Sequence, residues 1–338
     1  MTIEPDFNPK DLERAMGGPV LLDPVASGQS NPTWFVTSGD QKLVLRKKPA
    51  GATLNSAHAI EREYRVMKAL AGSGVPVPAM IRLEEDASVI GTPFYLMQRM
   101  AGQASENSAL PDLSTEQRGG FFAQAADILA RLHRLDWQAA GLSDFGRSGD
   151  YYARQVRRWV RQWQDSGTRK DAVIDGLADW FAANIPAPQP TTIVHGDFRV
   201  GNLLFDPAVG QVSAVLDWEL STLGDPLADL AHWCMFYDMG PDQLGGLNGL
   251  DLPALNIPDA AAFLDMYRQA GGCDAPLTPF HRAFALFRMS VIFEGIAARV
   301  RSGQAVNSEA AAVGALAPDL ARLADAILSG DRAGNASL

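Results

Sequence analysis

Short apolar runs and one stretch of helical periodicity make up the first hundred residues. The runs are alternating or rich in β-branched residues, which predicts strands at residues 34–38, 42–48, 80–86 and 93–100. Gly39-Asp40, between the first two runs, favours a hairpin. Residues 56–70 have apolar positions with the spacing of a helix, which should end before Gly72.

From residue 115 the pattern changes to helices, predicted at 115–135, 151–165, 171–183, 226–239, 259–270, 279–302 and 309–329. Strand-like runs interrupt this series only within residues 192–219. The pattern therefore predicts an α+β chain in two lobes. Residues 1–102 form a small antiparallel β lobe with one helix, and the hinge lies near 98–102. Residues 103–330 form a larger, mostly helical lobe, and 331–338 form a mobile tail.

Composition and charge mainly exclude classes of function. Of the 338 residues, 47% are hydrophobic and 20% are charged, as in ordinary globular proteins. Residues 1–102 hold 11 basic and 11 acidic residues, so the net charge of −10 arises in the remainder, with 18 basic and 28 acidic residues. An acidic majority argues against nucleic-acid binding. We find no signal peptide and no apolar run of membrane-spanning length, and two cysteines give no disulfide framework, so we expect a cytoplasmic protein.

The segment His195-Gly196-Asp197-Phe198-Arg199-Val200-Gly201-Asn202 carries the strongest indication of chemistry. An Asp five residues before an Asn, between short apolar strands, is the spacing of a kinase catalytic loop, in which Asp meets the acceptor hydroxyl and Asn holds magnesium. Asp217 ends the next apolar strand and offers a second hard oxygen ligand. The alternative is that Asp197 and Asn202 only form turns, but the second carboxylate and both strands make that less favoured.

These segments resemble the aminoglycoside phosphotransferase and choline kinase-like family. Within it, the chain is most similar to the kinase-like domains fused to some acyl-CoA dehydrogenases and to their free-standing bacterial relatives. The resemblance rests on GQSNPTWFVTSG, VLRKKPAG, SAHAIEREYRVMKAL, HGDFRVGNLLFD, LDWELSTLGDPLADLA and LFRMSVIFEGIAAR, which together span about residues 28 to 300. It implies a two-lobed protein-kinase-like fold and the use of ATP with Mg2+.

The β-rich lobe should supply the nucleotide site. A loop containing Gly28, Ser30 and Asn31 stands where a kinase needs backbone close to phosphates, although an ordinary turn is the favoured interpretation of these residues taken alone. Strand alternation places Arg46 and Lys48 on one face, and the family pattern selects Arg46 as the phosphate cation, with Lys48 as the second choice. A basic edge strand kept for solubility is the alternative for both.

Helix 56–70 should provide the carboxylate partner of that cation. Glu63 falls on its apolar side, and an inward carboxylate needs a cation, so we expect an ion pair with Arg46. The resemblance further implies that the linker contacts adenine through the backbone of Gln98 and Met100, with Met97 lining the pocket behind. For Met97 a role in an adaptable core strand is equally consistent with the sequence.

Residues 151–170 hold six basic residues and one Asp inside an otherwise acidic lobe. On a helix Arg154, Arg158 and Arg161 share one side. They either pair with acidic neighbours on a solvated face or bind an acceptor that carries phosphate or carboxylate. The branch resemblance implies hydroxyacyl-CoA acceptors, which carry such anions.

The sequence therefore predicts an ATP- and Mg2+-dependent phosphotransferase acting on a hydroxyl of a small molecule, with Asp197 as the catalytic residue. A hydroxyacyl-CoA is the favoured acceptor, and an aminoglycoside or choline-type acceptor is the alternative. A non-catalytic nucleotide-binding pseudokinase is the rival of a different class. Asp225 follows Asp217 by only eight positions, which leaves little platform for a peptide substrate. The sequence leaves open whether the protein is a monomer or a homodimer.

Overall fold

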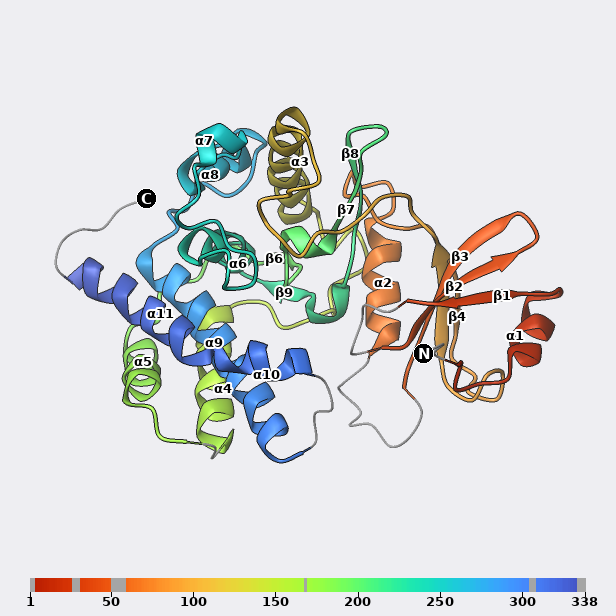
Figure 1. Ribbon diagram of the computed structural model, residues 1–338, viewed down its shortest axis with the longest axis horizontal. Coiled ribbons are helices and arrows are strands. Elements are labelled where there is room, and N and C mark those ends of the chain that lie inside the picture. Colours follow the sequence, from red (N-terminus) through yellow and green to blue (C-terminus); the bar gives the residue numbers. More distant parts are fainter. Residues whose placement is uncertain (1–3, 26–30, 50–58, 167–168, 304–307, 333–338) are drawn as a thin grey trace.

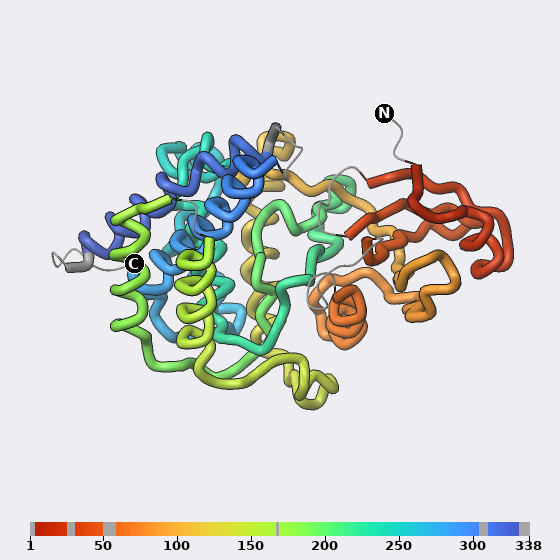
Figure 2. Tube along the Cα trace, turned by 90° about the horizontal axis from the view of Figure 1, so that it is seen from below, coloured from red at the N-terminus to blue at the C-terminus, as the bar shows by residue number. Residues whose placement is uncertain are grey.

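The computed structural model describes residues 4–25, 31–49, 59–166, 169–303 and 308–332. A small antiparallel sheet with its helices and a larger, mostly helical region lie side by side (Figure 1). The chain therefore has the two-lobed α+β fold that the sequence predicts. In the view turned by 90°, α2 (Ile60–Leu70) again lies between the sheet and the helical lobe (Figure 2).

The sheet of the small lobe has the strand order β1-β2-β3-β5-β4, and every neighbouring pair is antiparallel. Its strands are β1 (Leu21–Pro24), β2 (Thr33–Ser38), β3 (Gln41–Lys47), β4 (Met80–Glu84) and β5 (Phe94–Gln98). Ser38 pairs with Gln41 across the hairpin, and Gly39 adopts a φ of 56°, the left-handed conformation that glycine permits. This confirms the predicted hairpin.

The larger lobe surrounds two short ribbons with helices. The ribbons pair β6 (Thr192–Val194) with β9 (Thr222–Gly224) and β7 (Leu203–Asp206) with β8 (Gln211–Val215). Two 3-10 turns, η1 (Val200–Asn202) and η2 (Trp218–Leu220), follow β6 and β8 in the chain. The helices are α3 (Thr115–His133), α4 (Tyr151–Ser166), α5 (Ala172–Ala183), α6 (Leu227–Asp238), α7 (Leu252–Leu255), α8 (Ala260–Gln269), α9 (Pro279–Arg301), α10 (Ser308–Ala315) and α11 (Ala317–Arg332).

Each lobe has its own apolar core. The smaller core lies between the sheet and α1 (Pro9–Met16), where Leu12, Trp34 and Leu45 are buried. The larger core fills the helical lobe and continues through the apolar side of α2, which contributes Ile60 and Leu70. Because α2 belongs to the same apolar cluster as the helical lobe, the carboxylate of Glu63 in this helix is held in a fixed place relative to both lobes.

Four expectations need correction. The predicted helix 309–329 is two helices, because Pro318 lacks the N–H of a continuous ladder and the chain turns at Leu316. Helix 56–70 starts at Ile60, with Ala59 as its N-cap, and 56–58 lie outside the described residues. α11 continues through Arg332, two residues into the predicted tail. The sequence pattern also missed α1, α7, β1 and β9.

A helix that crosses a bilayer must be both long and apolar. Among the helices in the described part of the chain, none meets both conditions.

Candidate active site

The loop His195–Asn202 is held from below by α6. Asp229 is fully buried and accepts hydrogen bonds from the backbone N–H groups of His195 at 2.7 Å and Gly196 at 2.8 Å. Gly196 has a φ of 85°, and a Cβ there would lie 2.7 Å from the carbonyl oxygen of Leu220. His195 is buried, and its Nε2 lies 2.9 Å from the carbonyl oxygen of Leu216. These contacts give Asp229 and His195 a scaffold role, because they hold the backbone of the loop in place.

Asp197 projects from this loop, and each of its carboxylate oxygens contacts another side chain. Asn202 Nδ2 donates to Asp197 Oδ2 at 2.8 Å, and Nε2 of His232 lies 2.7 Å from Oδ1. The N–H of His232 is not well aligned with that oxygen, but the separation is that of a hydrogen-bonded contact. Burial alone would raise the pKa of Asp197, but the contact with His232 and the charges of His232 and Arg199 outweigh it and hold the pKa below its usual value.

His232 was not among the site residues predicted from the sequence. It lies in α6, three residues after Asp229, and therefore on the same side of that helix. Burial lowers the pKa of His232, although the contact with Asp197 opposes this shift. A His spaced i+3 from the scaffold Asp was the one indication in the sequence that could have identified it.

Asn202 and Asp217 are brought together by the backbone. The N–H of Leu216 donates to the carbonyl oxygen of Asn202 at 2.8 Å, so the residue before Asp217 is tied to the loop. Both hydrogen bonds that the Asn202 side chain forms among the described residues use its Nδ2, which leaves Oδ1 for another partner. Asp217 adopts a φ of 63°, a left-handed conformation that Asp and Asn tolerate better than most residues.

Arg46 extends from β3 in the small lobe to Asp217 in the large lobe. Its Nε lies 3.0 Å from Oε2 of the buried Glu63, which confirms the predicted ion pair between strand and helix. Its NH2 lies 3.4 Å from Oδ1 of Asp217 and 3.7 Å from Oε2 of Glu219. Arg46 thus links the small lobe to the end of β8 in the large lobe.

Further polar groups fix Glu63. Asn31 Nδ2 donates to Oε1 at 3.0 Å, and the hydroxyl of Tyr95 donates to Oε2 at 3.0 Å. The side chain of Asn31 is completely buried, so any contact of this residue with a phosphate would use its backbone. Gly28 and Ser30, the other residues predicted in that loop, lie outside the described residues.

The two lysines after Arg46 have other partners. Lys48 Nζ lies 3.0 Å from Glu61, on the outer side of α2. Lys47 is almost fully buried, and its Nζ lies 2.8 Å from Oδ2 of Asp6. Between the two cations that the sequence left open, Arg46 is the one that contacts Asp217.

The charges around Arg46 fit a divalent cation. Beside Glu63, the carboxylates of Asp217 and Glu219 lie within 3.4 Å and 3.7 Å of Arg46 NH2, so acidic oxygens gather at the end of β8. No group of three or more His, Cys, Asp or Glu able to hold a metal occurs in the described part of the chain. Magnesium bound to a nucleotide takes most of its ligands from phosphates and water, so Asp217 and Oδ1 of Asn202 suit it.

Glu63→Gln should change how stability depends on pH. Burial raises the pKa of Glu63 to about 7, in spite of Arg46, whereas the unfolded value is near 4.3. A folded pKa above the unfolded one means that the contribution to stability is full at low pH and is lost as pH rises towards 7. Relative to Glu63→Gln, the wild type should lose roughly 3 kcal/mol of unfolding free energy between pH 4.5 and pH 7.5. Urea unfolding at several pH values measures it; parallel curves would contradict the raised pKa.

The linker between the lobes follows β5. Gln98 and Met100 are at least partly exposed there, and Met97 packs against the large core. The backbone N–H of Gln103 donates to the carbonyl of Phe205 at 2.9 Å, which fixes the end of the linker against β7. No residue in the described ranges accepts a hydrogen bond from the N–H of Met100, so this donor is available to a ligand.

A cavity of about 520 Å³ begins at Asp197. Its polar end contains Asp197, Arg199 and Glu106, and Arg199 NH1 lies 2.7 Å from Oε2 of Glu106. The rest of the wall is mainly apolar and comes from α6, the following loop, α9 and α10: Met235, Phe236, Leu244, Met289, Phe293 and Val313. We call it the apolar acceptor cavity. Segments more than a hundred residues apart form it, so the sequence did not indicate it.

The arginines predicted on one side of residues 151–165 line a separate cavity, between α4 and α9. Arg154 donates to the carbonyl oxygens of Arg147, at 2.6 Å, and Gly149. Arg158 and Arg161 are exposed, and no described carboxylate forms an ion pair with either. Their placement on one side is as expected, but the expected alternative of pairing with acidic neighbours does not occur among the described residues.

A small antiparallel sheet, an Arg–Glu ion pair between strand and helix, and an Asp–Asn loop facing a strand-end Asp define the protein-kinase-like class of phosphotransferases. Comparison with known proteins gives the family. Residues 22–289 match the model of the phosphotransferase enzyme family (APH), and the chain belongs to that family.

Curated relatives include much longer proteins. The chain is 42% identical over 332 residues to acyl-CoA dehydrogenase family member 10 of Mus musculus, covering 96% of this chain and 31% of that protein. It is 37% identical over 281 residues to acyl-CoA dehydrogenase family member 11 of Homo sapiens, covering 82% and 36%. The chain thus spans about a third of the length of these relatives.

Solved structures share the fold. A Ralstonia eutropha protein provisionally named an aminoglycoside phosphotransferase superposes with a TM-score of 0.86 at 39% identity, covering 96% of this chain and 98% of that one. The aminoglycoside phosphotransferase APH(4)-Ia, in a ternary complex with ADP and hygromycin B, gives a TM-score of 0.60 at 17% identity, covering 93% and 98%. At that identity the likeness concerns the fold alone.

Proposed function

We propose that this protein transfers the γ-phosphoryl group of ATP to a hydroxyl of a hydroxyacyl-CoA thioester. The observation that carries the proposal is the apolar acceptor cavity, which has Asp197 at its polar end. An acyl chain suits apolar walls, because its burial removes hydrocarbon from water. A cationic aminoglycoside would need free carboxylates, and Glu106 is already paired with Arg199. The similarity to acyl-CoA dehydrogenase family members also supports this acceptor class.

ATP would lie between the lobes, with adenine against Met97 and the backbone of Gln98 and Met100. Arg46 would bind the α/β-phosphates, held in its orientation by Glu63. Asn202 Oδ1 and Asp217 would hold Mg2+, which neutralises charge on the phosphates. Gly28, Ser30 and Asn31 would form the loop over the phosphates.

Asp197 would position the acceptor hydroxyl for in-line attack. A bond forms between the hydroxyl oxygen and the γ-phosphorus while the bond to the bridging oxygen of ADP breaks, and the proton passes to Asp197. The lowered pKa of Asp197 makes it a weak base. This suits phosphoryl transfer through a loose transition state, where the hydroxyl loses its proton late. His232 and Asn202 hold the carboxylate in place for this step.

The acceptor class is tested by steady-state kinetics with hydroxyacyl-CoA thioesters of increasing chain length, choline and several aminoglycosides. We expect kcat/KM to be highest for a hydroxyacyl-CoA and to rise with chain length until the apolar acceptor cavity is filled. A higher kcat/KM for choline or an aminoglycoside than for every thioester would refute the acceptor assignment.

A further inference from the structure

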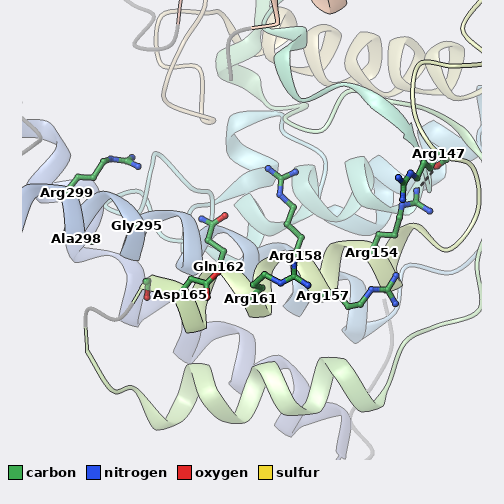
Figure 3. A pocket seen from close by; sticks show the side chains of 11 residues that line it. Arg147, Arg154, Arg157, Arg158, Arg161, Gln162, Asp165, Gly295, Ala298 and Arg299 are labelled. Carbon is green, nitrogen blue, oxygen red and sulfur yellow. Dashed lines mark hydrogen bonds between the residues drawn. The ribbon is translucent and has the colours of Figure 1, made fainter. Parts of the chain in front are cut away.

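A groove rich in arginine lies between α4 and α9 (Figure 3). Its volume is about 760 Å³, and we call it the arginine groove. The arginines that line it are Arg147, Arg154, Arg157, Arg158, Arg161 and Arg299. Among its described lining residues, Asp165 is the only acidic one. The groove thus concentrates positive charge in a chain with a net charge of −10.

This positive charge is not balanced by the protein. In the described ranges no ion pair joins a carboxylate to any of the six arginines, although most other arginines of the helical lobe have one. Arg154 and Arg158, like Arg157 and Arg161, are four residues apart on one helix, where like charges repel. An arrangement that costs stability in the free protein is relieved when an anion binds.

The shape of the groove suits an extended anion. Along α4 the rise of about 1.5 Å per residue separates Arg154 from Arg161 by roughly 10 Å, which allows contacts to more than one phosphate. Opposite them, α9 presents Gly295 and Ala298, and a Cβ at Gly295 would meet nothing closer than Gln162 at 4.0 Å. Arginine binds phosphate oxygens through two parallel N–H donors, so this wall matches phosphates well.

A short chain of contacts leads from the groove to the loop of Asp197. Arg158 lies over the Trp159 ring at 4.9 Å, and Arg288 lies 5.6 Å from the same ring. Arg288 NH2 also donates to the carbonyl oxygen of Gly196 at 2.8 Å. The groove is therefore close enough to the loop for one molecule with a long flexible arm to reach both places.

We propose that the arginine groove binds the phosphates of the nucleotide part of coenzyme A, while the acyl end of the same molecule enters the apolar acceptor cavity. The proposal rests on the proposed function, since it takes the acceptor to be a thioester of that carrier. The volume of the groove lies within the usual range for small-molecule sites. Arg158 and Arg161 are the contacts to test, because Arg154 already bonds backbone carbonyls of the loop before α4.

The test compares the double variant Arg158→Gln/Arg161→Gln with Lys42→Gln/Lys170→Gln. The control removes the same charge from exposed lysines that form no ion pair within the described ranges. Calorimetric titration with free coenzyme A should give a Kd at least about 10-fold weaker in the arginine variant than in the wild type and the lysine control. The preference in kcat/KM for a hydroxyacyl-CoA over the matching hydroxyacyl-pantetheine, which lacks the nucleotide phosphates, should fall at least about 10-fold.

Equal coenzyme A binding by the two variants would overturn the proposal. So would RNA or anionic vesicles that bind more tightly than coenzyme A and depend on the same arginines. The proposed function fails separately: if coenzyme A binding requires Arg158 and Arg161 but no hydroxyacyl-CoA is phosphorylated, the groove assignment stands and the acceptor assignment falls.

Discussion

Asp197→Asn is expected to lower kcat by about 1,000-fold or more, equivalent to about 4 kcal/mol of activation free energy. The substitution keeps the size of the side chain and its place beside Asn202 and His232, but removes the charge that receives the hydroxyl proton. ATP binding should change little, because the proposed mechanism places Asp197 at the acceptor hydroxyl and assigns the nucleotide and its magnesium to Arg46, Asn202 and Asp217. Steady-state kinetics and calorimetric titration with ATP analogues measure the two effects.

Asp179→Asn is a matched control, because Asp179 is an exposed residue of α5 that forms no ion pair with another described residue. It should leave kcat and the melting temperature unchanged. Near-normal turnover of Asp197→Asn would remove Asp197 from the mechanism, even if the rest of the site were correct.

Asp217→Asn is expected to lower kcat/KM for MgATP by at least about 100-fold and to raise the magnesium concentration that gives half-maximal rate. The loss follows from replacing a charged oxygen ligand by a neutral one. Asn adopts the left-handed backbone of position 217 as readily as Asp, so the change tests the ligand and not the turn.

Magnesium titrations of the rate at fixed ATP measure this effect, with Asp179→Asn again as control. An unchanged magnesium requirement in Asp217→Asn would show that the metal is held elsewhere. A lower melting temperature of the free protein would instead mean that the variant disturbs the contact with Arg46.

Periodicity in the sequence was sufficient to predict which way a side chain points where that direction depends on local geometry. Alternation along β3 left Arg46 and Lys48 as candidates, and the family resemblance selected Arg46. The helical face of α2 selected Glu63, and the structure brings Arg46 and Glu63 to 3.0 Å. The spacing of Asp197 and Asn202 similarly predicted two polar groups on one loop, which are hydrogen-bonded. In each case the relevant distance in sequence is short, or the regular element fixes the direction.

Contacts between distant segments were beyond such reasoning. Lys47 shares a strand face with apolar residues, but its neutralisation depends on Asp6, forty-one residues earlier. His232 acts on Asp197 through a helix whose place is set by packing of the whole lobe. The apolar acceptor cavity combines residues from Glu106 to Val313, so no local pattern could reveal it. Pro318, in contrast, is a local breaker that the helical periodicity around it obscured.

Transfer of the terminal phosphoryl group to the acceptor hydroxyl is the central claim, and mass spectrometry of the acceptor tests it most directly. The protein is incubated with Mg2+, a hydroxyacyl-CoA and ATP whose γ-phosphoryl oxygens are labelled with ¹⁸O. We predict that the acceptor becomes phosphorylated on its hydroxyl and that the amount of labelled phosphoryl group on it equals the amount of ADP formed. With Asp197→Asn, we predict no labelled acceptor. Unmodified acceptor together with ADP and labelled inorganic phosphate would contradict the account.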